Sequence, residues 1–160
     1  MLNNYRPISL LTSFSKILEK VIQTRLLDHL HKNETISKEQ YGFRRGFMKE
    51  NAVCKPINEV VNALNNKQIV GGIFCDLIKG FDYVDHDILI SKIEKYGIIG
   101  KGKELFQSYI KDRYQQDLID NKTDQNTAVS NWAVIKHGVP QGSVRGPTLF
   151  LLYVNDCLQS

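Results

Sequence analysis

Residues 69–75 read Ile-Val-Gly-Gly-Ile-Phe-Cys, and they lead directly into Asp76. The run is short and apolar on both of its alternating faces, which is typical of a strand buried inside a sheet. An ionised carboxylate beside such a strand is costly unless a cation or several donors meet it. Two readings of Asp76 stay open: a divalent-metal ligand at the carboxyl end of the strand, or the N-cap of a turn at 77–79.

Helical spacing of apolar side chains predicts helices on both sides of this strand. The clearest helix runs from Ser13 to Asn33, with Ser13 as its N-cap. Residues 113–137 predict a hairpin because a polar turn separates two alternating stretches. Further helices are expected at about 50–66, at 85–97 behind the caps Asp85 to Asp87, at 101–112 and at 147–154. The chain has no internal repeat, so the fold class expected is α+β in a single body.

Composition limits the class of protein. At 160 residues with 42% hydrophobic residues, the chain is long enough for one domain with a real core. It holds no apolar run of membrane-spanning length, and its start lacks the apolar core of a signal peptide. We therefore expect an intracellular protein, in nucleus or cytoplasm, with no membrane partner. The three cysteines are far apart, which indicates neither a disulfide framework nor a structural zinc site.

Basic residues are concentrated in the first third of the chain. Residues 1–56 hold ten Lys and Arg against five acidic residues, whereas the remaining 104 residues hold 11 against 12. A basic lobe suits nucleic acid or a triphosphate, although ordinary solvated helices carry similar excesses. Arg44 and Arg45, between glycines, could grip phosphates or could form a solvated turn.

A glycine-rich loop spans Gly138 to Gly146 and contains Gln141, whose side chain can both donate and accept hydrogen bonds. The N-terminus of the helix that follows would favour anionic groups. Such a loop is weak evidence by itself, and the chain carries no Walker loop, dinucleotide fingerprint or Ser-His-Asp arrangement.

Four groups of segments are each weak evidence when taken alone, but their combination, in this order along the chain, is highly specific for one family. They closely resemble the reverse transcriptase domain of non-LTR retrotransposons, and the jockey-like animal elements are the nearest in style. The likeness covers essentially the whole chain. The segments are 4–11 with 16–20, then 40–44, then 74–86, then 138–156.

The resemblance implies a right-hand polymerase fold, of which residues 1–68 would be mainly fingers and 69–160 mainly palm with some fingers. It implies that Asp76 is a catalytic palm carboxylate that binds metal, with the Leu77 backbone carbonyl beside it. The expected cofactor is a pair of Mg²⁺ ions, with Mn²⁺ as an alternative, because nucleotidyl transfer needs hard oxygen ligands.

The resemblance also assigns the remaining site residues. Phe81 would act as the bulky gate under the incoming sugar and favour deoxynucleotides. Gln141 would contact the incoming nucleotide, and Gly142 would let the backbone pass close to the nascent pair. The nucleotide-binding set implied is Arg44, Arg45, Phe81, Gln141 and Gly142, and the nucleic-acid-binding set is Arg6, Lys16 and Gly142. The partners implied are an RNA template, a DNA primer and deoxynucleoside triphosphates, with the oligomeric state unspecified.

The chain also departs from the family pattern. The family's Ala-Asp-Asp turn is expected shortly after Asn155 and Asp156, so we expect residues 1–160 to lack part of the carboxylate set, the thumb and the endonuclease region, and not to extend a primer alone. Gly80 stands where alanine is typical, and Arg145 where an apolar residue is typical. Two further hypotheses stay open: a non-catalytic nucleic-acid-binding remnant, and a translated relic without present function.

Overall fold

The computed structural model describes residues 8–44, 46, 49–77, 79–121 and 126–158. Within those residues the chain forms five α-helices, a short 3-10 helix and four strands. They are α1 (Ser13–Lys32), α2 (Lys49–Asn65), α3 (His86–Lys95), α4 (Lys101–Ile110), β1 (Arg113–Gln115), β2 (Leu118–Asn121), β3 (Asn126–Val129), β4 (Ala133–Ile135), α5 (Gly146–Val154) and η2 (Asn155–Leu158). All five predicted helices are therefore confirmed, each with both ends within two residues of the expected ones.

The cap of α1 lies one residue earlier than expected. Thr12 has extended backbone, and its hydroxyl accepts a hydrogen bond from the Ser15 amide at 3.3 Å. The prediction of Ser13 as N-cap is wrong because Ser13 already has helical geometry. The last turn of α1 carries His29, His31 and Lys32, which suits the negative end of the helix dipole.

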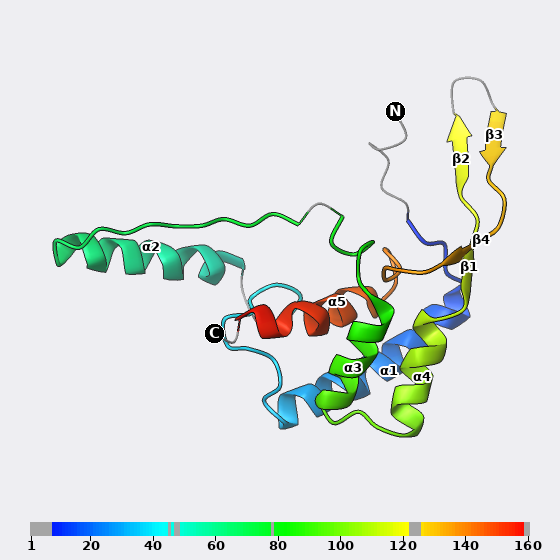
Figure 1. Ribbon diagram of the computed structural model, residues 1–160, viewed down its shortest axis with the longest axis horizontal. Coiled ribbons are helices and arrows are strands. Elements are labelled where there is room, and N and C mark those ends of the chain that lie inside the picture. Colours follow the sequence, from blue (N-terminus) through cyan, green and yellow to red (C-terminus); the bar gives the residue numbers. More distant parts are fainter. Residues whose placement is uncertain (1–7, 45, 47–48, 78, 122–125, 159–160) are drawn as a thin grey trace.

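The hydrophobic core lies among α1, α3, α4 and α5, which Figure 1 shows gathered at one end of the molecule. Leu30 of α1, Leu89 and Ile93 of α3, and Ile110 of α4 are fully buried there. Helix α5 adds Leu149, Leu151 and Leu152, so its apolar sequence is explained by burial on several sides.

The hairpin predicted over 113–137 is confirmed as two antiparallel pairs. Strand β1 pairs with β4, with Arg113 opposite Ile135, and β2 pairs with β3, with Leu118 opposite Val129. Figure 1 shows the β2–β3 pair extending away from the helices. The polar turn at 122–125 lies outside the described residues.

The predicted buried strand at 69–75 is wrong. These residues form no ladder, and Ile69, Ile73 and Phe74 are each more than nine-tenths exposed. In Figure 1 the chain returns from the far end of α2 as an extended, uncovered segment. A strand needs neighbours that satisfy its amide and carbonyl groups, and the only strand pairs among the described residues come from 113–135.

The α+β class is confirmed by this mixture of helices and small antiparallel sheets. Along the stretches that the structure describes, we find no helix with both the length and the apolar character needed to cross a bilayer.

Candidate functional site

The Gly138–Gly146 loop is hydrogen-bonded to the segment that begins at Phe81. The Gly138 amide donates to the Val84 carbonyl, and the Val139 amide donates to the Phe81 carbonyl, both at 2.8 Å. Gly138 has a φ of +91°, and a Cβ there would lie 2.9 Å from the Asp82 carbonyl oxygen. Only glycine fits this approach, so the loop is seated directly on residues 81–84.

Gln141 and Gly142 are held on two sides. The Gln141 side chain donates from Nε2 to Oδ1 of Asp82 at 3.0 Å, and the backbone carbonyl of Gln141 accepts from the Ser9 amide at 2.8 Å. Gly142 also has a φ of +91°, and a Cβ there would come within 3.1 Å of Ile8. Gln141 and Gly142, which the resemblance predicts to contact the nucleotide, are therefore fixed between residues 8–9 and Asp82.

Phe81 belongs to an aromatic cluster beside this loop. Its ring stacks on Phe150 of α5, with centroids 4.6 Å apart, and meets the edge of Phe43 at 5.9 Å. A Cβ on Gly80 would lie 3.1 Å from the Phe150 ring. The glycine that departs from the family pattern thus leaves room for Phe150, and the ring of Phe81 is held by partners from two distant segments.

A cleft of about 350 Å³ opens next to the loop, between its first residues and the β1–β4 pair. Its lining includes Asp82 and Gln141 from the site described above. Arg113, Lys136 and His137 add basic or titratable groups to the lining. The cleft therefore offers both acidic and basic hydrogen-bonding groups beside Gln141.

His86 supports the same loop, a role that the sequence did not indicate. Asp85 is the N-cap of α3 as predicted, because its Oδ1 accepts from the amides of Asp87 and Ile88 at 2.9 Å. The Ile88 amide is the main reason that the pKa of Asp85 lies below its ordinary value. His86 is buried, and its Nε2 lies 2.8 Å from the Gly138 carbonyl oxygen. The partner is 52 residues away in sequence, so local spacing carried no signal for it.

A second group of residues, which the sequence did not indicate, contacts the loop at Val144. Glu19 of α1 is 2% exposed, and it accepts from the Tyr109 hydroxyl at 2.7 Å and from the Val144 amide at 2.8 Å. The Arg145 guanidinium lies 3.7 Å above the Tyr109 ring centre. Burial raises the pKa of Tyr109 to about 12, so its hydroxyl stays a donor at neutral pH.

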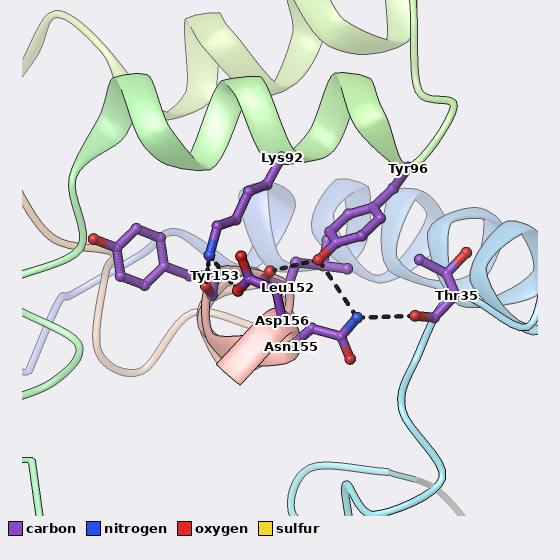
Figure 2. A network of polar contacts seen from close by, with 7 residues as sticks. All are labelled: Thr35, Lys92, Tyr96, Leu152, Tyr153, Asn155 and Asp156. Carbon is purple, nitrogen blue, oxygen red and sulfur yellow. Dashed lines mark hydrogen bonds and ion pairs between the residues drawn. The ribbon is translucent and has the colours of Figure 1, made fainter. Parts of the chain in front are cut away.

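Figure 2 shows a third network, which ties the segment after α1 to α3 and α5. The Asn155 side chain donates to the Thr35 carbonyl at 2.9 Å, and its Oδ1 accepts from the Ser37 amide at 2.9 Å. Lys92 pairs with Asp156 and donates to the Tyr153 carbonyl. This network fixes the position of residues 35–37. Because Arg44 donates to the Ser37 carbonyl, the network also helps to hold the turn that contains Arg44.

Arg44 lies near the site but is bonded elsewhere. Its Nη1 donates to the carbonyls of Ser37 at 3.0 Å and Gln40 at 3.3 Å. Its neighbour Phe43 reaches Phe81, so the turn at 40–44 does lie beside the aromatic cluster. In this structure the guanidinium therefore braces the turn through backbone carbonyls.

The other predicted residues are not brought to the loop. Asp76 and Leu77 lie on exposed, irregular chain, and neither is among the residues that line the cleft. Lys16 is exposed on α1. Arg6 and Arg45 lie outside the described residues.

The donor chemistry at Asp76 and Leu77 fits a hard divalent cation, since both offer oxygen ligands. Three acidic, histidine or cysteine side chains grouped closely enough to hold a metal ion do not occur anywhere in the described part of the chain. The described residues thus offer the Asp76 carboxylate and the Leu77 carbonyl as candidate ligands but no complete metal site.

Comparison with known proteins gives a consistent result. The family described as Reverse transcriptase (RNA-dependent DNA polymerase) matches residues 2–160. The chain is similar to the probable RNA-directed DNA polymerase from transposon BS of Drosophila melanogaster, with 35% identity over 96% of this chain and 16% of that protein. It is also similar to the RNA-directed DNA polymerase from mobile element jockey of Drosophila melanogaster, with 33% identity over 96% of this chain and 16% of the relative. No solved structure matches the chain significantly. The chain spans about a sixth of the length of these relatives.

Proposed function

The chain belongs to the reverse transcriptase family of jockey-like non-LTR retrotransposons, and from that premise we propose that it supplies the nucleotide-contacting part of an RNA-directed DNA polymerase. Residues 1–68 would be mainly fingers and residues 69–160 mainly palm with some fingers, in a right-hand arrangement. The observation that carries the proposal is the seating of Gln141 and Gly142 against Asp82 and residues 8–9.

The loop provides the contact with the incoming deoxynucleotide. Gln141 keeps one amide hydrogen and its Oε1 for a ligand while the bond to Asp82 fixes its direction. Because Gly142 lacks a side chain, its backbone can lie close to a bound base pair. A loop fixed before the ligand arrives loses less conformational freedom on binding, which favours affinity.

Phe81 sets the choice of sugar. Its ring is held by Phe150 and Phe43, so it cannot swing aside cheaply when a larger sugar enters. A ribose 2′-hydroxyl would collide with this ring, whereas a deoxyribose would not. Arg44, and Arg45 with it, would hold the triphosphate once the guanidinium of Arg44 turned from the Ser37 and Gln40 carbonyls.

Asp76 and the Leu77 carbonyl would provide ligands for Mg²⁺, or for Mn²⁺ in its place, together with carboxylates from elsewhere in the polymerase. When bound, such cations lower the pKa of the primer 3′-hydroxyl and stabilise the leaving pyrophosphate. Arg6 and Lys16 would contact the phosphates of the RNA template or DNA primer.

A second candidate is nucleic-acid binding without catalysis. It is favoured by one observation, that Asp76 is exposed and is not grouped with two other acidic side chains among the described residues. The basic first third would then bind nucleic acid through phosphate contacts alone, with strong salt dependence.

A chimaera tests the polymerase proposal. Residues 1–160 replace the matching segment of the jockey polymerase of Drosophila melanogaster, and Mg²⁺-dependent primer extension is measured on an RNA template. We expect extension by the chimaera, loss of at least about a hundredfold with Asp76→Asn, and no change with Asp28→Asn, an exposed aspartate on α1. If the chimaera binds primer and template but extends no primer, the binding-only candidate replaces the polymerase proposal; if Asp76→Asn extends as well as the unsubstituted chimaera, Asp76 is not a catalytic metal ligand.

A further inference from the structure

We propose that Glu19, Tyr109 and Arg145 form a positioning cluster that fixes the second half of the Gly138–Gly146 loop and thereby the geometry of Gln141 and Gly142. The inference rests on the proposed function for its catalytic meaning, because the cluster would act on the nucleotide only through those two residues. Its three members come from α1, α4 and the N-cap of α5, which are far apart in the sequence.

The cluster is bonded to the loop through its backbone. The Glu19 carboxylate accepts from the Val144 amide at 2.8 Å, two residues after Gly142. The Ser143 hydroxyl donates to the Pro140 carbonyl at 2.8 Å and accepts from the Gly146 amide at 2.9 Å. A change at Val144 is therefore passed to Pro140 and to Gln141, since the turn between them is closed by hydrogen bonds.

The second carboxylate oxygen of Glu19 is held by the Tyr109 hydroxyl at 2.7 Å. Glu19 is 2% exposed, so losing this donor would leave a buried acceptor unsatisfied. Tyr109 thus sets the position of the carboxylate that holds Val144.

Stability alone does not explain why the buried residue at position 145 is an arginine. It is 4% exposed, and its Nε and Nη1 atoms are buried without a hydrogen-bond partner among the described residues. An apolar side chain, the type expected there from the family pattern, would fill the same space without the cost of burying a cation. A planar guanidinium 3.7 Å above the Tyr109 ring instead fixes that ring through cation–π attraction.

The chain offers a matched control. Tyr96 is also a partly buried tyrosine at the edge of the core, and its hydroxyl bonds to the Leu152 carbonyl in the network of Figure 2. Tyr109→Phe and Tyr96→Phe each remove one hydroxyl from one packed ring. A general loss of stability would affect both, whereas loss of positioning would affect Tyr109→Phe alone.

The experiment measures amide hydrogen exchange by NMR in the full 160-residue chain, with and without a deoxynucleoside triphosphate, and the affinity for dGTP. We expect Tyr109→Phe and Arg145→Leu to speed exchange at Gly142 and Val144 by about 5–10-fold and to weaken dGTP binding by a similar factor. Arg145→Lys should fall between Arg145→Leu and the unsubstituted chain, because lysine keeps the charge and loses the planar stacking. Tyr96→Phe should leave exchange at Gly142 and Val144 unchanged.

Exchange at Gly142 and Val144 that is the same in Tyr109→Phe as in the unsubstituted chain would overturn the positioning role. Equal acceleration in Tyr96→Phe would overturn it too, because that result indicates general loosening. If the expected exchange pattern occurs in a chain that does not bind dGTP, the cluster is upheld as a device that fixes the loop, and the proposed nucleotide contact is overturned.

Discussion

The Gln141 side chain donates to Asp82 at 3.0 Å, across 59 residues of sequence. Asp82 lies six residues after Asp76 and one after Phe81, so this bond joins the loop to the segment that carries the proposed sugar gate and the candidate metal ligand. The hydrogen bond to Asp82 holds the Gln141 side chain in one orientation on the glycine-rich loop.

Removing the Asp82 carboxylate should free the Gln141 side chain. We expect Asp82→Ala to weaken the binding of a deoxynucleoside triphosphate by about 3–10-fold, because the amide must then be ordered on binding. Isothermal titration calorimetry of the full chain measures this affinity. The control is Asp112→Ala, an exposed aspartate that does not line the cleft. Unchanged affinity in Asp82→Ala would show that Gln141 is not oriented for the nucleotide by this bond.

Gly146 is required by space at the start of α5. A Cβ there would lie 2.6 Å from the Pro140 carbonyl oxygen and 2.9 Å from Ser143 Oγ. We therefore expect Gly146→Ala to lower the free energy of unfolding by about 1–3 kcal/mol, as overpacking against fixed backbone does. Urea denaturation followed by circular dichroism measures it.

Gly71 provides the control for that substitution, because a Cβ at Gly71 meets nothing within 4 Å. Gly71→Ala should change the free energy of unfolding by less than about 0.5 kcal/mol. Equal losses in the two variants would contradict the steric explanation.

The part of the fold that could be predicted from sequence is the part determined by local pattern. The periodicity of α1 and the cap at Asp85 depend on residues a few positions apart, and the structure confirms both apart from the shift of the α1 cap to Thr12. The apolar run at 69–75 gave the wrong prediction for a physical reason. Its pattern indicates a buried strand only if other strands lie beside it, and among the described residues none does.

At the candidate site, too, only the features set by local sequence pattern could be predicted. The loop and Gln141 could be found from glycines and from the family pattern, but their supports could not. His86, Glu19 and Tyr109 each contact the loop or its partner from at least 50 residues away. Such contacts arise from the packing of whole helices, and no spacing in the sequence indicates them.

Asp85 should stabilise the protein at neutral pH and less in acid. The Ile88 amide, and after it the Asp87 amide, lower the pKa of Asp85 in the folded state. A lowered folded pKa adds stability above the unfolded pKa, near 3.8, and this stability is lost as pH falls through the folded value. We expect Asp85→Ala to cost about 1 kcal/mol at pH 7, the usual worth of an N-cap, and clearly less at pH 3.

Thermal unfolding of Asp85→Ala at both pH values tests this. Asp87→Ala is the control, since its carboxylate is exposed and pairs at the surface with Lys111. A loss in Asp85→Ala that is independent of pH would contradict the electrostatic part of the cap.

Tyr109 should make the protein sensitive to alkali. Burial raises its folded pKa to about 12 from 10.0. A raised folded pKa adds stability that is fully present below pH 10 and is lost as pH rises toward 12. Because phenylalanine cannot ionise, we expect the free energy of unfolding of Tyr109→Phe to fall less between pH 10 and 12 than that of the unsubstituted chain. Urea midpoints at pH 8, 10 and 11.5 measure this, and identical alkaline losses in the two proteins would refute it.

The last prediction concerns the proposed gate role of Phe81. Phe81 is held on its two sides by Phe150 and Phe43, so shortening it opens space that the neighbouring rings do not fill at once. We expect Phe81→Val, in the jockey chimaera described above, to reduce the preference for deoxynucleotides over ribonucleotides by at least about tenfold, because discrimination by steric exclusion disappears with the excluding atoms. Single-nucleotide primer extension with dCTP and CTP gives the ratio of the two kcat/KM values. Phe43→Val removes a ring from the same cluster without removing the gate, so it should lower both efficiencies together and keep their ratio. A changed ratio in Phe43→Val with an unchanged ratio in Phe81→Val would move the gate from Phe81 to Phe43.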